Sequence, residues 1–240
     1  MNRINPSKIV CVGRNYAKHA AELGNDVPTE PLIFLKPPSS LIFEGDDIVM
    51  PAGAGRVDFE GEIGVIIGRA ARGVSTDEAW DYVESLIPVN DVTARDLQWS
   101  DDQWTRAKGF DSFCPVGSAV PLADVDLAGL DVTTRVNGEL RQQGPASDMV
   151  FDIPAIIAYV SGIMTLEPGD LIATGTPDGI GPLAEGDEVV VEVSGVGSVS
   201  NRVVAGSQCR STMRSTSRCR RFRLRKSRPC GRRPRPREST

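Results

Sequence analysis

Three carboxylic acids occupy alternate positions in a run of otherwise apolar residues. Asp58, Glu60 and Glu62 lie in the segment 57–67, which is typical of a β-strand, and alternate side chains of a strand share a face. Because carboxylates on one face repel each other, they need water, basic partners or a cation. A further acid, Asp91, ends another apolar run. An all-oxygen set of this kind suits Mg²⁺, Mn²⁺ or Ca²⁺ and does not suit zinc.

The spacing of these acids alone does not establish a metal site. A solvated strand face with Arg56 or Arg69 nearby explains the same pattern, and we weigh the two interpretations equally.

A second group of candidates lies near the N-terminus. His19 is the only histidine in the chain, and Glu22 follows three residues later, so a helix would place both on one face. A carboxylate beside an imidazole fixes its tautomer and raises its basicity, as a general base acting on water requires. On these two residues alone, a surface histidine with an ion-pair neighbour is the commoner interpretation.

Two further segments could bind an anion. Lys108 lies between an alanine and a glycine, where its ammonium could reach a carboxylate or an enolate, although a surface lysine is the commoner case. The segment 173–179 follows an expected strand, and its glycines would let backbone N–H groups approach an anion. A plain turn is an equal alternative for this segment, whose spacing does not match a P-loop.

Apolar runs and alternation predict the elements that would position these residues. Strands outnumber helices and do not alternate regularly with them, which favours an α+β fold over a doubly wound sheet. We expect helices at 16–23, 75–83 and 153–163. We expect strands at 8–13, 32–35, 57–67, 86–92, 132–136, 139–140, 171–173, 188–193 and 198–204.

Local signals support several of these boundaries. Asn15 is expected to cap the first helix and Gly24 to follow its C-terminus. The sequence Ser-Thr-Asp-Glu at 75–78 is typical of a capping box, and Asn-Gly at 137–138 is typical of a hairpin turn. Pro88 places its strand near an edge or a bulge.

The charge divides the chain into two parts. Residues 1–204 hold 14 basic and 31 acidic residues, whereas residues 205–240 hold 13 basic residues and one acid. The tail has no hydrophobic period and cannot bury a core, so we expect it to be disordered. It is either a basic arm for a polyanion or out-of-frame sequence. We favour the second interpretation, because composition changes directly after a finished hairpin, and we do not expect nucleic acid as a partner.

The remaining composition bears on the compartment. No apolar run approaches the length of a membrane span, and the N-terminus lacks the apolar core of a secretory signal. Five cysteines without a disulfide framework indicate a reducing compartment. We therefore expect a cytoplasmic protein.

Six short stretches, taken in order, resemble the fumarylacetoacetate hydrolase family. The resemblance covers residues 8–204 and is strongest with short-chain members, the acylpyruvases and 2-hydroxyhepta-2,4-diene-1,7-dioate isomerases. It implies a mixed β-sandwich roll of the family's C-terminal domain type in a catalytic domain spanning 1–204, usually as a homodimer. The stretches are Lys8 to Tyr16, Phe34-Leu35-Lys36-Pro37, Asp58-Phe59-Glu60-Gly61-Glu62, Asn90 to Asp96, Ala107 to Asp111, and Thr174-Gly175-Thr176-Pro177.

The resemblance also implies roles for the candidate residues. It implies Mg²⁺ or Mn²⁺ held by Glu60, Glu62 and Asp91, with Asp58 outside the ligand set. It implies that His19 and Glu22 are a water-activating pair, in a segment that orders as a lid, and that Lys108 faces the substrate. It also implies that three groups lie near the bound acid: Arg95, Gln98 and Thr176.

The implied substrate is a 3-acylpyruvate or a related 2-oxo or 2-hydroxydienoic acid, as in the catabolism of aromatic compounds. His19, oriented by Glu22, would generate hydroxide that attacks the distal carbonyl, and C–C cleavage would leave a pyruvate enolate stabilised by the metal and Lys108. A dienedioate isomerase and an oxaloacetate decarboxylase could use the same stabilisation. The pair favours hydrolysis, because an isomerase needs no hydroxide. A non-catalytic scaffold whose tail binds nucleic acid is the alternative from another class.

Overall fold

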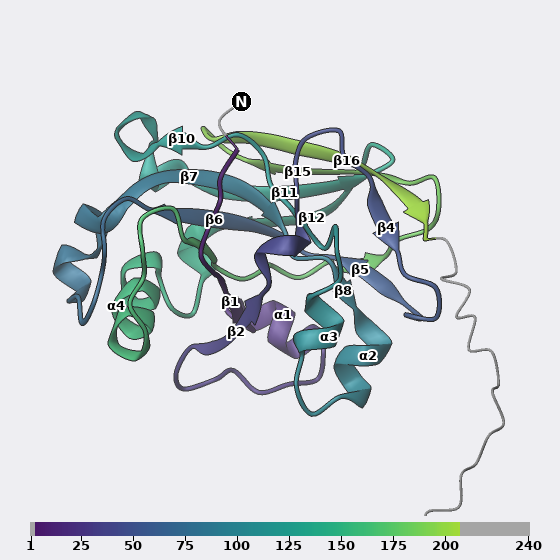
Figure 1. Cartoon of the computed structure of the whole chain (residues 1–240), viewed down its shortest axis with the longest axis horizontal. Helices are drawn as coiled ribbons and strands as arrows, with labels where there is room; N and C mark the ends of the chain where they lie inside the picture. Colours follow the sequence, from purple (N-terminus) through teal and green to yellow (C-terminus); the bar gives the residue numbers. More distant parts are fainter. Residues whose placement is uncertain (1–2, 207–240) are drawn as a thin grey trace, which may run out of the picture. The chain divides into compact units, whose positions relative to one another are not determined.

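The computed structural model describes residues 3–206, so the predicted basic tail lies outside the described residues from position 207 onward. The larger of its two main sheets is mixed: β1 and β13 are parallel, and the other neighbours are antiparallel. Its order is β10 (Val120–Pro121), β7 (Val83–Asn90), β6 (Gly61–Ile67), β13 (Leu171–Ala173), β1 (Ile9–Gly13) and β2 (Leu32–Lys36) (Figure 1).

The second main sheet is also mixed, because its last strand runs parallel to its neighbour. Its order is β12 (Glu139–Pro145), β11 (Asp131–Val136), β15 (Glu188–Val193), β16 (Gly197–Ala205) and β4 (Ile48–Met50). Two small sheets complete the strands: β14 (Gly181–Pro182), β5 (Val57–Phe59) and β8 (Thr93–Ala94) form one, and β3 (Leu41–Ile42) and β9 (Cys114–Pro115) form the other.

The helices are few and mostly short. The α-helices are α1 (Ala17–Glu22), α2 (Arg95–Ser100), α3 (Thr105–Lys108) and α4 (Ile153–Ile163). The 3₁₀ helices are η1 (Pro38–Ser40), η2 (Thr76–Tyr82), η3 (Leu122–Asp124), η4 (Leu127–Gly129) and η5 (Ala146–Asp148).

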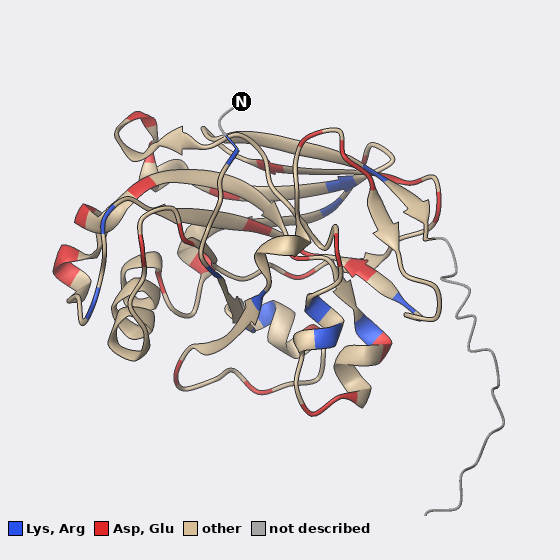
Figure 2. Ribbon diagram, viewed as in Figure 1, with Lys and Arg blue, Asp and Glu red and all other residues tan. Residues whose placement is uncertain are grey.

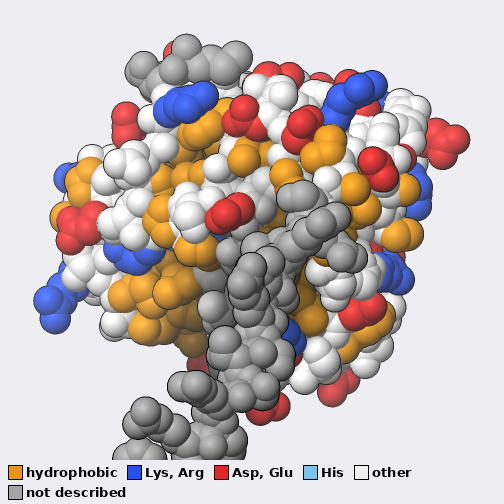
Figure 3. Space-filling view, turned by 45° about the vertical axis from the view of Figure 1, so that its right-hand side comes forward, with side chains coloured by type: hydrophobic (Ala, Val, Ile, Leu, Met, Phe, Trp, Pro, Cys, Tyr) orange, Lys and Arg blue, Asp and Glu red, His pale blue; other side chains and the backbone are white. Residues whose placement is uncertain are grey.

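One large group of buried apolar side chains joins the two main sheets and α4. Val10 and Ile63 enter it from the first sheet, Val132 and Val191 from the second, and Ile156 from the helix. Sheet faces that bury their apolar residues against each other form a sandwich. The predicted α+β class and mixed sandwich are therefore confirmed. Some apolar side chains still reach the surface (Figure 3), Trp99 and Leu35 among the described ones.

The expected turns and caps are confirmed in part. Asn137 and Gly138 have φ of 52° and 81°, as a two-residue type I′ hairpin turn requires. Gly24 has φ of 68° after α1; the Asn25 N–H donates to the Ala20 carbonyl, and the Gly24 N–H donates to Ala21. This is a Schellman ending, as predicted for Gly24.

The cap predicted for Asn15 is wrong. Tyr16 is the N-cap of α1, and no side chain bonds to the helix there. The Asn15 amide instead donates to the carbonyls of Phe151 and Thr174, 2.9 and 2.8 Å away, and its oxygen accepts from the Phe151 N–H. Asn15 therefore ties the start of α1 to distant segments of the chain.

One other prediction needs correction. The helix expected at 75–83 is the 3₁₀ helix η2. The Ser75 hydroxyl donates to the Glu78 carboxylate, and no side chain caps the N-terminal backbone of this helix. Pro88 lies near the edge of its sheet, as predicted: β7 is the strand next to the edge strand β10, and β10 pairs only with Ser85 and Leu86. No register shift occurs at Pro88, since the irregularity lies between Ile66 and Ile67.

The strand predicted at 57–67 is interrupted at Glu60. Residues before the break pair within the small β14-β5-β8 sheet, and residues after it pair with β7 and β13. Gly61 allows this change of sheet, because a side chain there would collide with the Thr134 hydroxyl. The chain therefore turns its acids inward instead of presenting a solvated face.

Asp170 joins the parallel strands β1 and β13, and its side chain accepts hydrogen bonds from Ser7, Lys8 and the Glu167 N–H. Burial opposes its ionisation, but these hydrogen bonds hold the pKa of Asp170 below its usual value. A carboxyl whose pKa is lower in the folded state than in the unfolded state stabilises the fold at pH values above its unfolded-state pKa. This stabilisation is lost as the pH falls through the folded-state pKa.

We expect Asp170→Asn to lower the free energy of unfolding by about 1–3 kcal/mol at pH 7, because an amide leaves donors unpaired. The difference should narrow as the pH falls from 7 through the depressed pKa of Asp170, because the carboxyl itself then becomes protonated. Urea unfolding of the wild type and of Asp170→Asn at a series of pH values from 7 downward measures this difference in the free energy of unfolding. Asp81→Asn is the matched control: its side chain is 75% exposed, so a change below about 0.5 kcal/mol is expected. Equal losses in the two variants would contradict the assignment.

Candidate metal and active site

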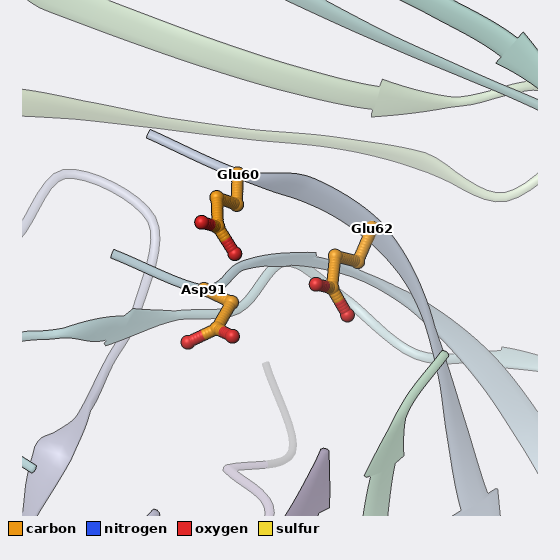
Figure 4. Close-up of side chains that lie close together, drawn as sticks. All are labelled: Glu60, Glu62 and Asp91. Atoms are coloured by element: carbon orange, nitrogen blue, oxygen red, sulfur yellow. The ribbon is translucent and has the colours of Figure 1, made fainter. Parts of the chain in front are cut away.

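Three carboxylates converge where the first sheet meets the small one. Glu60, Glu62 and Asp91 are buried, and one oxygen of each lies within 4.8 Å of the others (Figure 4). Glu60 lies in the break between β5 and β6, Glu62 in β6, and Asp91 just after β7. The Asp91 N–H donates to the Glu60 carbonyl at 2.8 Å, and the Glu60 N–H donates to the Asn90 side chain at 3.0 Å. These bonds hold the two strand ends together.

Buried cations surround the carboxylates. Lys108 Nζ lies 2.9 Å from Glu60 Oε2 and 2.6 Å from Asp91 Oδ2, and Lys36 Nζ lies 2.5 Å from Asp91 Oδ1. Arg95 Nη2 donates to Glu60 Oε1. The blue ribbon segments of Figure 2 mark lysine and arginine residues on the short helices in this region. Each cation therefore fixes the orientation of a specific carboxylate oxygen.

Asp58 extends this cluster of charges through two arginines. Its carboxylate accepts from Arg95 Nε at 3.0 Å and from Arg56 Nε and Nη2 at 2.7 and 3.0 Å. The charges therefore alternate from one side of the site to the other, in the order Arg56, Asp58, Arg95, Glu60, Lys108, Asp91 and Lys36.

Glu62 differs from the other carboxylates, since it has no ion pair with any described residue. Its Oε2 accepts only the Gly175 N–H, at 2.8 Å. Burial, Asp91 and Glu60 together raise the pKa of Glu62 well above its usual value. Burial also opposes ionisation of Glu60, but Lys108 and Arg95 reverse the effect and hold its pKa well below the usual range. Three buried oxygen donors, one of them without a cation, fit a hard divalent ion.

His19 and Glu22 face the same region from α1. His19 is buried, and its Nδ1 lies 3.4 Å from Glu22 Oε2. Glu22 also accepts from the Gly179 N–H at 3.2 Å. The glycines of segment 173–179 thus do bring backbone N–H groups to anions, and these anions are the side chains of Glu62 and Glu22.

One cavity of about 180 Å³ collects these groups. Its lining combines the polar groups of His19, the three carboxylates and Lys108 with large apolar side chains. The lining residues are Val12, Gly13, Arg14, His19, Leu23, Asn25, Phe34, Glu60, Glu62, Asp91, Arg95, Gln98, Trp99, Trp104, Lys108 and Thr176. The structure therefore brings all of the predicted site residues except Glu22 to the cavity wall, and Glu22 contacts it through His19.

The three residues predicted near a bound acid make different contacts. The Arg95 guanidinium is fully buried and donates to Asp58, Glu60 and Gln98. The Gln98 oxygen accepts from Arg95 at 2.5 Å. Thr176 Oγ1 donates to the Gly61 carbonyl and accepts from Gln142, both at 2.8 Å. All three line the cavity, but Arg95 mainly positions protein carboxylates.

The surface interpretations of these residues are wrong. Glu60, Glu62, Asp91, His19 and Lys108 are all buried, with His19 4% exposed and Lys108 2% exposed. A solvated strand face, a surface histidine and a loop lysine are thereby excluded.

Two further residues, one beside the carboxylates and one in the cavity wall, were not predicted as site residues. Lys36 ends β2, directly before a proline, and its ammonium contacts Asp91. A single lysine at the end of an apolar strand was the available signal. Arg14 follows β1 and lines the cavity. Nothing in the local sequence distinguishes Arg14 from a surface arginine.

Comparison with known proteins defines the class of this protein. Residues 8–204 match the model of the family described as "Fumarylacetoacetate (FAA) hydrolase C-terminal". The chain therefore belongs to the fumarylacetoacetate hydrolase family, as the six sequence stretches predicted.

Several relatives with named activities are similar to this chain. The oxaloacetate tautomerase FAHD1, mitochondrial, of Bos taurus is 46% identical over 200 residues, which is 81% of this chain and 90% of the relative. The structure of a 2-hydroxyhepta-2,4-diene-1,7-dioate isomerase from Mycobacterium marinum has a TM-score of 0.78 at 45% identity and covers 85% of this chain and 77% of its own. A fumarylpyruvate hydrolase from Pseudomonas aeruginosa, in complex with Mn²⁺ and pyruvate, has a TM-score of 0.81 at 29% identity, over 85% of this chain and 92% of its own.

Residues 3–206 contain no helix with the length and apolar character that a membrane crossing would need.

We expect Mg²⁺ or Mn²⁺ to raise the melting temperature of the wild type, since binding to the native state stabilises it by about 2.7 kcal/mol at 100 times Kd. Glu62→Gln should lose most of this metal-dependent rise. Without metal, Glu62→Gln should melt at or above the wild-type temperature, because repulsion with Glu60 and Asp91 is removed while the Gly175 N–H keeps an acceptor.

Thermal unfolding with Mg²⁺ and with EDTA tests both expectations for Glu62→Gln: the loss of the metal-dependent rise, and a melting temperature at or above that of the wild type without metal. Glu139→Gln, the same change at an exposed position, is the control and should respond to metal as the wild type does. A full metal-dependent rise in Glu62→Gln would remove this residue from the ligand set.

Proposed function

We propose that this chain is a divalent-metal-dependent enzyme that forms and stabilises the enolate of a 2-oxo acid. The observation that carries this proposal is the opening of one cavity onto three groups at once. These are the buried carboxylates, the Lys108 ammonium and the imidazole of His19. Family membership supports the proposal, since the named relatives act on acids of this kind.

Glu60, Glu62 and Asp91 would hold Mg²⁺ or Mn²⁺ through their carboxylate oxygens. When bound, the cation supplies a Lewis acid that polarises the 2-oxo group of the substrate. Arg95 and Lys36 hold the carboxylates of Glu60 and Asp91 in a fixed orientation for this role. The proposed catalytic domain spans residues 1–204.

His19 would transfer the proton. Because Nδ1 faces Glu22, Nε2 is the nitrogen that remains to accept a proton from water or from substrate carbon. Glu22 in turn is held by the Gly179 N–H, so the pair is anchored to the segment that follows β13. Glu22 is therefore a positioning residue that orients the imidazole and stabilises its protonated form.

Lys108 would stabilise the negative charge that develops on the substrate oxygen. Burial opposes its positive charge, but Asp91 and Glu60 outweigh burial and raise the pKa of Lys108, so the ammonium stays protonated at neutral pH. A charged donor fixed in a buried site stabilises a developing oxyanion at little reorganisation cost.

Two reactions share this machinery. In C–C hydrolysis of a 3-acylpyruvate, His19 takes a proton from water and hydroxide attacks the distal carbonyl. In the conversions of oxaloacetate no hydroxide is needed. For keto–enol conversion, His19 would move a proton between carbon and oxygen; for decarboxylation, the C3–C4 bond would break with release of CO₂, and His19 would donate a proton to C3 of the pyruvate enolate that remains. Sequence reasoning favours the first reaction, and the 46% identical oxaloacetate tautomerase favours the second. The homodimer and the aromatic catabolic role remain predictions that rest on the family resemblance.

Spectrophotometric assays of the purified full chain separate these reactions. With Mg²⁺, acetylpyruvate should lose its enol absorbance and yield pyruvate if the chain is a C–C hydrolase. Oxaloacetate should interconvert its keto and enol forms faster than the uncatalysed rate if it is a tautomerase. Excess EDTA should abolish either activity. Absence of both activities in a folded, Mg²⁺-binding protein would overturn the proposed function.

We expect His19→Gln to lower kcat by about 10²- to 10⁴-fold, the usual contribution of a general base. Glu22→Gln should lower kcat less, because it acts through His19, and it should shift the pH profile of kcat/KM. Glu30→Gln is the matched control, since Glu30 is an exposed acid in the loop after α1. A Glu22→Gln enzyme with the full rate and an unchanged pH profile would remove the positioning role.

A further inference from the structure

Gln142 carries a buried amide and lies on β12, in the main sheet that does not contain the proposed metal ligands. Its side chain is 1% exposed. Its Oε1 accepts from the Gly61 N–H at 2.9 Å, and its Nε2 donates to Thr176 Oγ1 and to the Pro177 carbonyl, both at 2.8 Å. Burying an amide is costly unless its polar groups are hydrogen-bonded, and here the oxygen and both N–H groups have partners.

Three hydrogen bonds close a ring at Gly61. The Gly61 N–H donates to Gln142, the Gln142 Nε2 donates to Thr176 Oγ1, and the Thr176 hydroxyl donates back to the Gly61 carbonyl at 2.8 Å. All three donors follow the same direction around the ring, so each bond polarises and strengthens the next. The ring also fixes the orientation of the amide, because a flipped Gln142 would place its NH₂ group against the Gly61 N–H.

Gly61 separates two of the proposed metal ligands. Its N–H belongs to the peptide unit that it shares with Glu60, and its carbonyl belongs to the unit that it shares with Glu62. Because each peptide unit is planar, hydrogen bonds to both groups fix the two planes. They also fix the Cα atoms from which the two carboxylate side chains begin. The ring therefore holds the spacing of Glu60 and Glu62.

The strand that carries Gln142 is irregular at this position. Gln142 pairs with Thr134, but the next residue of β11, Arg135, pairs with Leu140, so Arg141 is the extra residue of a β-bulge. A regular strand would place Leu140 and Gln142 on one face. The bulge instead leaves Leu140 47% exposed while Gln142 is buried. Bulges next to active sites commonly redirect a side chain in this way.

A glycine brings the partners of the amide close to the bulge. Gly179 has φ of 96°, and a Cβ there would lie 2.1 Å from the Arg141 carbonyl oxygen. Glycine permits both the backbone conformation and the close approach. An apolar side chain at position 142 would fill the space but would leave the Gly61 N–H without this acceptor. The bulge, the glycine and the buried amide together favour a role in holding Gly61 over a role in packing.

We propose that Gln142 is a positioning residue for the divalent cation. Through Gly61 it sets the separation of the Glu60 and Glu62 carboxylates before a cation binds, which raises the affinity of the site for Mg²⁺ or Mn²⁺. Gln142 itself would touch neither the cation nor the substrate. The proposal rests on the proposed function, because it takes Glu60, Glu62 and Asp91 as the ligands of the cation.

Titration of the full chain with Mn²⁺ alone, followed by the electron paramagnetic resonance signal of the free ion, measures the Kd. Gln142→Met keeps the length of the side chain and removes its hydrogen bonds to Gly61, Thr176 and Pro177. We expect it to raise the Kd about 10- to 100-fold, the usual effect of losing a residue that holds a metal ligand. Gln142→Asn keeps an amide that is too short to span Gly61 and Pro177, and it should also raise the Kd.

Two controls separate positioning from stability. Gln143→Met is the same change at the next residue, which is exposed, and it should keep the wild-type Kd. Ile156→Val removes a methyl group from α4 in the large apolar core, away from the ring. It should lower the melting temperature and leave the Kd unchanged.

Two results would overturn the proposal alone, in a chain whose Glu62→Gln variant loses Mn²⁺ binding. The first is a wild-type Kd in folded Gln142→Met or Gln142→Asn. The second is an equal rise of the Kd in Ile156→Val, since affinity would then follow stability. Failure of the proposed function looks different: the wild type would not bind Mn²⁺, or Glu62→Gln would bind it as the wild type does, and the inference would fall with it.

Discussion

The burial of four carboxylates against fewer buried cations is the constraint on which the rest of the site depends. Asp58, Glu60, Glu62 and Asp91 are at most 5% exposed, and the lysines and arginines buried with them among residues 3–206 are Lys36, Arg95 and Lys108. Arg56 adds a fourth cation from a partly exposed position. Removing charges from water is costly, and replacing buried ion pairs by apolar residues is often neutral or stabilising. Such a cluster therefore indicates a site whose geometry matters more than its contribution to stability.

The fold supplies this cluster by interrupting two strands at the same point. The chain changes sheet at Glu60, and β7 ends just before Asp91, so both acids leave the regular ladders beside each other. Short helices then deliver Arg95 and Lys108 from one side, and α1 delivers His19 from another. The large apolar core between the main sheets keeps these loops and breaks in position.

The sequence predicted this arrangement unevenly, for physical reasons. Alternation and turn chemistry identified most long strands, the Asn137 hairpin and α4, since those signals are local. The alternation of residue types could not show the break in the strand at Glu60, because the break depends on the close approach of Gly61 to Thr134 in the other main sheet. The helices α2 and α3 are too short to carry a hydrophobic period. Burial of His19 and Lys108 is likewise a tertiary property, so their neighbours in sequence predicted a surface location.

The measurement that tests the central claim most directly is anomalous diffraction from crystals of the full chain soaked in Mn²⁺. The claim predicts one peak in contact with an oxygen of each of Glu60, Glu62 and Asp91. It also predicts that Lys108 still reaches the same cavity. A crystal that binds Mn²⁺ elsewhere, or that leaves these three carboxylates without it at a concentration that supports turnover, would contradict the claim.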